Sequence, residues 1–223
     1  MKRLNCKFLL LIIILFFIQC SHKTDPFGPD IGSSMQEESE ILIVNSLMID
    51  DFKGNNIGGI WNVQNDSANG GNSTISFAKK TNIYSGITNR YIWVQYTLGP
   101  NYQYRYVFLQ NNFNETNLIN YNGLKFLLRG SGNKLRIMIR SDSVAGSNYD
   151  DFGYVINQTP NNWTEFIIKF SDFNQEGWGT PMDKNEVLRH LNKIQFKASS
   201  MISGESGWFE VDNVSFVTLS LKR

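Results

Sequence analysis

Cysteine and histidine are scarce in this chain of 223 residues, which contains two of each. Cys6 lies in an N-terminal segment that we expect to be removed, so the mature chain keeps only Cys20 and no internal disulfide is predicted. His22 and His190 do not have the spacing of metal ligands, and the sequence contains no HExxH or CxxC motif. A Ser–His–Asp triad would depend on His190 alone, and no GxSxG motif supplies its serine. The sequence therefore predicts neither a zinc site nor a triad hydrolase.

A surplus of positive charge is also missing. The chain has 21 lysine and arginine residues against 20 aspartate and glutamate residues, for a net charge of +1. Proteins that bind a phosphate backbone neutralise it with clustered lysine and arginine, so nucleic acid is not expected as a partner. The hydrophobic fraction of 41% and the aromatic fraction of 13% are sufficient for a packed core.

The N-terminal residues have the pattern of an export signal. Basic residues precede an apolar run from Phe8 to Ile18, which is shorter than the about 20 residues that span a bilayer. The run ends in the residues FIQC, which resemble a bacterial lipobox, although Gln19 stands where a small residue is usual. We expect residues 1–19 to be a lipoprotein signal peptide and Cys20 to carry the lipid anchor. An ordinary signal peptide followed by a chance cysteine is the alternative.

Residues 20–40 form a polar stretch of Ser, Gly, Pro and Glu with few apolar residues, which is typical of a flexible tether. Residues 41–223 then form a segment of a length that suits one domain. With a lipid at Cys20, we expect this domain to be displayed in the cell envelope outside the cytoplasm, at the outer membrane or the cell surface.

From residue 41 onward, short apolar segments alternate with turn sequences such as NGGN, GPN and GSGN. Many short segments at regular spacing predict an all-β sandwich or barrel. One short connecting helix is also predicted, because Pro181, Asp183 and Glu186 provide N-terminal helix signals before an apolar stripe at Val187, Leu188 and Leu191. Four tryptophans lie in or beside strands, where we expect them to pack in the core: Trp61, Trp93, Trp163 and Trp208.

Four segments carry a resemblance to a known family, and they are residues 48–61, 121–132, 163–173 and 207–214. In this order they resemble the family 11 carbohydrate-binding modules and the related complex I intermediate-associated protein family, over roughly residues 48–217. The resemblance implies a two-sheet antiparallel jelly roll whose concave face holds a polysaccharide or oligosaccharide without turnover. We therefore expect a binding protein and no enzyme, displayed near partner glycosidases or surface proteins. A protein-interaction and assembly module is the alternative, and a small glycoside hydrolase is less favoured.

The resemblance also implies one structural calcium ion that ties the first strand to the last. Asp51 and Asp212 lie at the matching positions, and calcium prefers oxygen ligands. Lys53 departs from the family, in which the residue after the opening Phe is often acidic. The alternative is that Asp51 and Asp212 bond to turn backbone or cap the ends of strands.

Candidate ligand-binding residues follow from the chemistry of sugars, whose C–H faces stack on aromatic rings and whose hydroxyls bond to polar side chains. Side chains alternate along a strand, so residues 135–140 place aliphatic residues on one face and arginines on the other. Trp178 lies between two glycines in a loop where no core requires it. The expected sugar-binding set is Arg136, Arg140, Asp142, Tyr149, Tyr154, Trp178 and Tyr106. Tyr106 shares its face with Phe108, so that face could instead be core.

Overall fold

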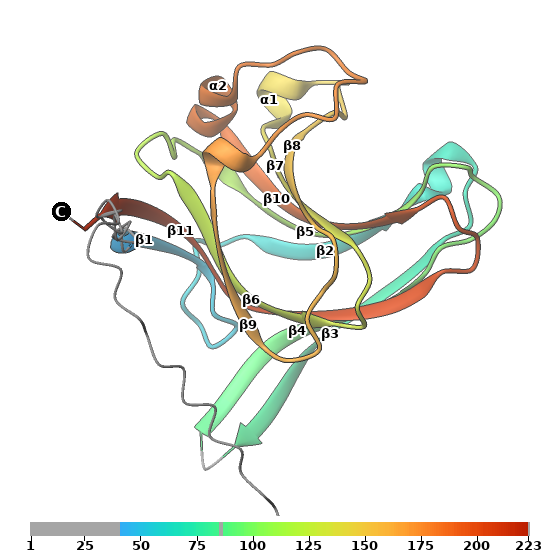
Figure 1. Cartoon of the computed structure of the whole chain (residues 1–223), viewed down its shortest axis with the longest axis horizontal. Coiled ribbons are helices and arrows are strands. Elements are labelled where there is room, and N and C mark those ends of the chain that lie inside the picture. Colours follow the sequence, from blue (N-terminus) through green and yellow to red (C-terminus); the bar gives the residue numbers. More distant parts are fainter. Residues whose placement is uncertain (1–40, 85–86, 223) are drawn as a thin grey trace, which may run out of the picture. The chain divides into compact units, whose positions relative to one another are not determined.

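Two antiparallel β-sheets pack face to face in the computed structural model, which describes residues 41–84 and 87–222 (Figure 1). The predicted signal peptide, the anchor Cys20 and the tether up to residue 40 lie outside the described residues. The predicted all-β, two-sheet jelly roll is confirmed. No helix in the described part of the chain is long and apolar enough to cross a membrane.

The six-stranded sheet has the order β3-β4-β11-β6-β9, and β1 pairs with β11 off this path. Its strands are β1 (Ile41–Asp50), β3 (Thr74–Tyr84), β4 (Ile87–Thr97), β6 (Gly123–Gly130), β9 (Thr164–Lys169) and β11 (Ser206–Leu221). The five-stranded sheet has the order β2-β5-β10-β7-β8. Its strands are β2 (Ile60–Asn65), β5 (Arg105–Thr116), β7 (Leu135–Arg140), β8 (Phe152–Ile156) and β10 (Leu191–Ser200).

Short helices occupy connections between the strands and form no layer of their own. They are η1 (Asp66–Asn69), α1 (Asp142–Ala145), η2 (Phe170–Asp172) and α2 (Lys184–Arg189). The predicted helix is α2, and the side chain of Asp183 caps it by accepting the N–H of Asn185 at 2.8 Å. The single turn α1 was not predicted. The side chain of Ser141 caps α1 by accepting the N–H of Val144.

Aromatic side chains fill the space between the two sheets. Phe126 of β6 meets Phe196 of β10 edge to face with ring centroids 5.3 Å apart, and Phe196 stacks on Phe209 of β11 at 6.4 Å. All three side chains are fully buried. Contacts of this kind across the two inner faces hold the sandwich together through buried apolar area and aromatic packing.

Only one of the four strand-associated tryptophans belongs to this core. Trp61 is buried against Phe52 and Phe196, whereas Trp93, Trp163 and Trp208 are half-buried outside the core cluster. The prediction that these three pack in the core is therefore wrong. Ile92 and Val94 face the core in β4, so alternation turns Trp93 to the outer face of the six-stranded sheet.

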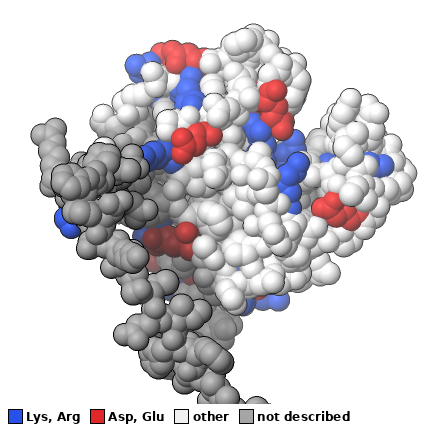
Figure 2. Space-filling view, in the orientation of Figure 1, with Lys and Arg blue, Asp and Glu red and all other residues white. Residues whose placement is uncertain are grey.

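The outer face of the five-stranded sheet lies between two raised walls (Figure 1). On one side are α1, the connection from β7 to β8, and the segment between η2 and α2. On the other side are η1 and the connections β4–β5 and β10–β11. The space-filling view shows a hollow between these walls, with basic and acidic side chains gathered on it (Figure 2).

Candidate functional site

A row of amide side chains crosses the floor of this face. The strand register places Asn62, Gln110 and Gln195 opposite one another on β2, β5 and β10. The Gln110 Nε2 donates to Asn62 Oδ1 at 2.9 Å, and the Gln195 Nε2 donates to Gln110 Oε1 at 2.9 Å. Each amide thus orients its neighbour, which gives the floor fixed polar groups on a rigid sheet.

A strip of aromatic rings runs beside the amides. Tyr106 and Phe108 on β5 have ring centroids 4.9 Å apart, and the ring centroid of Tyr102 lies 6.5 Å from that of Tyr106. The core takes Val107 and Leu109, so Tyr106 and Phe108 belong to the outer face, which settles the alternative that the sequence left open. Asn69 of η1 donates to the Tyr106 hydroxyl at 3.0 Å. Burial, together with Tyr102 and Asp66, raises the pKa of Tyr106, so its phenol is a neutral hydrogen-bonding group.

Lys197 brings a positive charge to the middle of the face. It lies opposite Phe108 in the register, and its Nζ is 5.7 Å from the ring centroids of both Tyr106 and Phe108. Burial lowers the pKa of Lys197, and the nearby Glu176 carboxylate opposes that shift. Glu176 also pairs with Arg136, whose Nη1 lies 3.2 Å from Glu176 Oε1.

Trp178 is displayed by a loop that a buried carboxylate holds in place. Asp150 is 1% exposed, and it accepts the backbone N–H groups of Glu176, Gly177 and Gly179 at 2.7, 2.8 and 3.0 Å. Burial alone would raise the pKa of Asp150, but these three donors lower it, so the carboxylate stays ionised. The ring of Trp178 is 61% exposed, and its Nε1 donates to Glu176 Oε2 at 3.2 Å.

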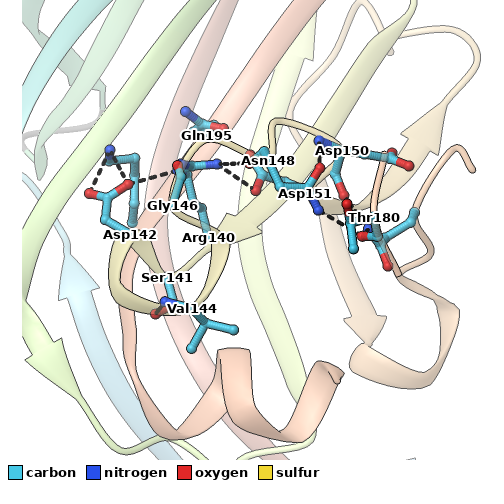
Figure 3. Close-up of polar contacts among 12 residues, drawn as sticks. Arg140, Ser141, Asp142, Val144, Gly146, Asn148, Asp150, Asp151, Thr180 and Gln195 are labelled. Atoms are coloured by element: carbon cyan, nitrogen blue, oxygen red, sulfur yellow. Dashed lines mark hydrogen bonds and ion pairs between the residues drawn. The ribbon is translucent and has the colours of Figure 1, made fainter. Parts of the chain in front are cut away.

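Arg140 is buried beneath the connection from β7 to β8 and is 5% exposed (Figure 3). Its guanidinium donates to the carboxylates of Asp142 and Asp151 at 2.7 and 2.9 Å, and to the carbonyls of Gly146 and Asn148, each at 2.7 Å. The expectation that Arg140 faces the ligand is therefore wrong, because residues 141–151 fold back over the strand and accept four of the five guanidinium N–H groups. Arg140 instead positions the wall of the site.

The carboxylate of Asp142 stabilises the same wall through hydrogen bonds. It accepts from Arg140 and from Lys193, whose Nζ lies 3.0 Å from Asp142 Oδ2. Partial burial would raise the pKa of Asp142, but the hydrogen bonds from Arg140 and Lys193 lower it to about 2.

Arg136 is also enclosed and is 8% exposed. Its Nη2 donates to the carbonyls of Asp151 and Asn174 at 3.1 and 2.6 Å, and its Nη1 pairs with Glu176. The predicted role of Arg136 as a sugar-binding residue is therefore wrong, because Asp151, Asn174 and Glu176 enclose its guanidinium. Arg136 thus joins Asp151 to the segment that carries Trp178, and Arg140 braces residues 142–151.

The two tyrosines predicted as ligand-binding residues beyond β7 differ in exposure. Tyr149 is 66% exposed at the rim, and the Arg140 guanidinium lies 5.0 Å from the centroid of its ring. Tyr154 pairs with Ile137 and packs toward the core near Phe173, so its predicted place on the sugar-facing surface is wrong. The outer-face position of β8 belongs to Gly153, which pairs with Met138.

The structure therefore brings Trp178, Tyr149 and Tyr106 to one face, with Arg136 and Arg140 buried beneath its wall and Asp142 exposed on the wall itself. Sequence reasoning missed the amide row, Tyr102, Phe108, Lys197 and Glu176. The alternation of polar residues at positions 193, 195, 197 and 199 was the available signal for this outer face.

Asp51 and Asp212 do not form a ready calcium site. Asp51 Oδ1 accepts the N–H groups of Lys53, Gly54 and Asn55 at 2.8, 3.1 and 3.0 Å, so Asp51 bonds to turn backbone, as the alternative interpretation had it. Asp212 is fully buried, and its Oδ2 has no hydrogen-bond partner among the described residues. No cluster of three or more His, Cys, Asp or Glu side chains suited to a metal occurs in residues 41–84 and 87–222.

Comparison with solved structures identifies the same architecture elsewhere. A family 11 carbohydrate-binding module from Clostridium thermocellum, solved with a β-1,3-1,4-mixed-linked tetrasaccharide, has 22% sequence identity and a TM-score of 0.57 over 78% of this chain and 95% of that one. The family 11 module of the C. thermocellum cellulosomal cellulase Lic26A-Cel5E has 21% identity and a TM-score of 0.59 over 82% and 99% of the two chains. At these identities the likeness shows a shared fold.

No curated protein sequence matches the chain. The sequence model of the family described as Complex I intermediate-associated protein 30 (CIA30) matches residues 51–212. That match begins at the end of β1, ends within β11 and spans more than half of the chain. This chain belongs to the CIA30 family.

Proposed function

We propose that this protein is a non-catalytic carbohydrate-binding lipoprotein that holds a polysaccharide or oligosaccharide on the outer face of the five-stranded sheet. The observation that carries the proposal is Trp178, an exposed indole on a loop fixed by the buried Asp150 carboxylate. Tryptophan is enriched among the residues that contribute most to binding, so an exposed indole on a fixed loop is a candidate anchor for a ligand.

The remainder of the face supplies what a sugar needs. Tyr106, Phe108 and Tyr149 offer further ring surface, and Asn62 offers the partly exposed amide of a polar floor in which Gln110 and Gln195 are buried. Sugar C–H faces stack on rings while hydroxyls bond to fixed polar groups. A module of the same fold was solved with a β-1,3-1,4-mixed-linked tetrasaccharide, so we choose that class of ligand as the first probe.

The carboxylates of this face support binding over hydrolysis. Asp150 is saturated by backbone N–H groups, Asp151 pairs with Arg140, and Glu176 pairs with Arg136. Burial raises the pKa of Asp151 to about 6 although Arg140 opposes the shift, but the side chain is enclosed by the wall. A glycosidase needs a pair of carboxylates on either side of the substrate, roughly 5–10 Å apart.

Affinity electrophoresis in gels containing mixed-linked β-glucan tests this proposal. We expect the protein to be retarded, Trp178→Ala to migrate freely, and Trp93→Ala on the opposite sheet to be retarded like the parent. A circular dichroism spectrum of each variant verifies folding. Release of reducing sugar by the parent protein would contradict the non-catalytic assignment, and equal retardation of both variants would contradict the site.

A protein-interaction and assembly role is the second candidate. Tyr104, Met201 and Ile202 form exposed apolar tips on the adjacent connections β4–β5 and β10–β11, where Arg105 Nη1 donates to the Met201 carbonyl at 2.8 Å. Failure to bind any glycan on an array, together with a stable protein partner that Met201→Ser or Ile202→Ser removes, would favour this role.

The lipid anchor and the calcium ion are separate proposals. We expect Cys20→Ala to abolish lipid labelling of the protein and its recovery in the membrane fraction of the cell envelope; unchanged labelling would rule the anchor out. For calcium, the hydrogen bonding of Asp51 leads us to expect that a chelator leaves the melting temperature unchanged. A fall in melting temperature that added calcium reverses would show a site built from other ligands.

A further inference from the structure

A second hollow lies away from the proposed glycan face, between the β1–β2 connection and the β3–β4 hairpin. Its volume is about 390 Å³, and its lining includes Lys53, Lys79, Lys80 and Arg90. The hairpin projects beyond the body of the sandwich on the side opposite α1 and α2 (Figure 1). Lys79 and Thr81 of β3 and Arg90 of β4 approach the hollow from the hairpin, and Lys53 approaches from the connection.

Positive charge in this hollow is not neutralised locally. None of the four cationic side chains forms an ion pair with residues that the structure describes. Lys80 lies on the opposite face of β3 from Lys79, and its Nζ is 3.9 Å from the centroid of the Trp93 ring, so its charge is directed at that ring. Lys53, Lys79 and Arg90 are the cations left for the hollow, and they repel one another unless an anion joins them.

The one carboxylate in the lining is already used. Asp50 Oδ1 accepts the N–H of Phe52 at 2.7 Å, its Oδ2 accepts the indole N–H of Trp61 at 3.0 Å, and the residue is buried. The Asp50 bond holds Phe52 at a φ of 55°, a left-handed conformation that a bulky residue rarely adopts. Asp51 and Asp212 are the nearby carboxyls outside the lining. Asp51 is used by the turn, since it accepts the backbone N–H of Lys53 and the side-chain amide of Asn55. Burial raises the pKa of Asp212, and Lys53 opposes the shift.

We infer that this hollow is a second binding site, which takes a sulfate or phosphate monoester carried on a sugar-sized group. Lysine ammonium and arginine guanidinium groups form strong charge-assisted hydrogen bonds with tetrahedral oxyanions, and the Thr81 hydroxyl adds a neutral donor. The volume falls in the range of small-molecule sites, so it accommodates the carrier as well as the anion.

Binding of glucose 6-sulfate and glucose 6-phosphate to the full mature chain, measured by isothermal titration calorimetry at constant ionic strength, tests the inference. We expect at least one ester to bind and neutral glucose not to bind. Inorganic sulfate and phosphate are expected to bind about tenfold more weakly than the matching ester, because they lack the carrier. The ester that binds more tightly identifies the source of the oxyanion.

The variants Lys79→Gln with Arg90→Gln, and separately Lys53→Gln, are expected to weaken ester binding about tenfold or more. Lys169→Gln is the matched control, since Lys169 is an exposed lysine of β9 outside the hollow, and it should bind like the parent. The substituted side chains are exposed, and a circular dichroism spectrum of each variant verifies that it is folded. Trp178→Ala should leave ester binding unchanged, so failure at the glycan face and failure here are distinguishable. Equal binding of glucose and its esters, or equal losses in Lys169→Gln and the hollow variants, would overturn the inference.

Discussion

The outer faces of the two sheets both carry aromatic rings, but the rings differ in exposure and in the side chains that cover them. On the six-stranded sheet, Lys80 lies over Trp93 and Arg129 over Trp163, and Arg129 also pairs with Glu210. The tryptophans of that face are half-buried by their own neighbours. On the five-stranded sheet, Trp178 and Tyr149 project from a wall that is hydrogen-bonded internally, and their rings are mostly exposed.

This difference separates aromatic rings that pack against cations of their own chain from rings that remain exposed and can contact a ligand. The cations of the six-stranded sheet cover tryptophan faces and satisfy that surface within the chain. The cations Arg136 and Arg140 of the five-stranded sheet are turned under the wall, where they bond backbone carbonyls and carboxylates. Tyr149 still has the Arg140 guanidinium 5.0 Å from its ring centroid, whereas Trp178 has no cation over its ring among the described residues. The uncovered, exposed Trp178 ring is why we assign binding to that face.

The largest expected effect comes from removing the wall's central cation with Arg140→Met. The substitution leaves Asp151 as an unpaired buried charge and frees two loop carbonyls, so we expect the free energy of unfolding to fall by about 3–5 kcal/mol. Urea unfolding measures it. We also expect Arg140→Met to bind glycan more weakly than the parent. Arg129→Met on the other sheet should bind glycan like the parent, even if it lowers the free energy of unfolding. A loss below about 1 kcal/mol for Arg140→Met would show that the wall does not depend on this residue.

A smaller effect on stability, with a clear effect on binding, is expected for Gly179→Ala. A Cβ at this position would overlap Asn148 Oδ1 and lie 2.5 Å from Asp150 Cβ, which displaces the loop that carries Trp178. We expect glycan affinity to fall about tenfold and stability by about 1–2 kcal/mol. Gly204→Ala is the control, because its φ of +78° makes alanine strained while no atom lies within 4 Å of the added Cβ. If the two variants bind alike, the position of the Trp178 loop does not control affinity.

The smallest effect is a pH dependence at Asp142. Its folded-state pKa of about 2 lies below the usual value of 3.8, so the ionised form stabilises the fold at pH values above about 4. That contribution is lost as the pH falls from about 4 through about 2, because the unfolded chain takes up a proton in this range while the folded protein resists it. We expect Asp142→Asn to flatten the fall in melting temperature between pH 4 and pH 2. Parallel curves for the variant and the parent would mean that Asp142 is not coupled to Arg140 in solution.

The sequence predicted the sandwich, the helix α2 and the exposure of Trp178, because strand alternation, capping residues and flanking glycines are local signals. It did not predict that residues 141–151 fold back over Arg140, because an irregular connection that covers its own strand has no periodic pattern. Tyr154 was misplaced because Gly153 holds the outer-face position, where a Cβ would lie 2.5 Å from Arg136 Nε. Trp93 was misplaced because apolar and aromatic residues occupy both faces of β4 around it, so alternation there gives no contrast.

The most direct test of the site uses the indole N–H signals of the tryptophans, of which the chain has five. In a ¹H–¹⁵N correlation spectrum, titration with the mixed-linked β-glucan tetrasaccharide should shift the Trp178 signal while the signals of Trp93, Trp163 and Trp208 stay in place. Assignment by single Trp→Phe variants makes the measurement unambiguous. Shifts confined to the tryptophans of the six-stranded sheet, with the Trp178 signal unmoved at saturation, would contradict the assignment of glycan binding to the five-stranded sheet.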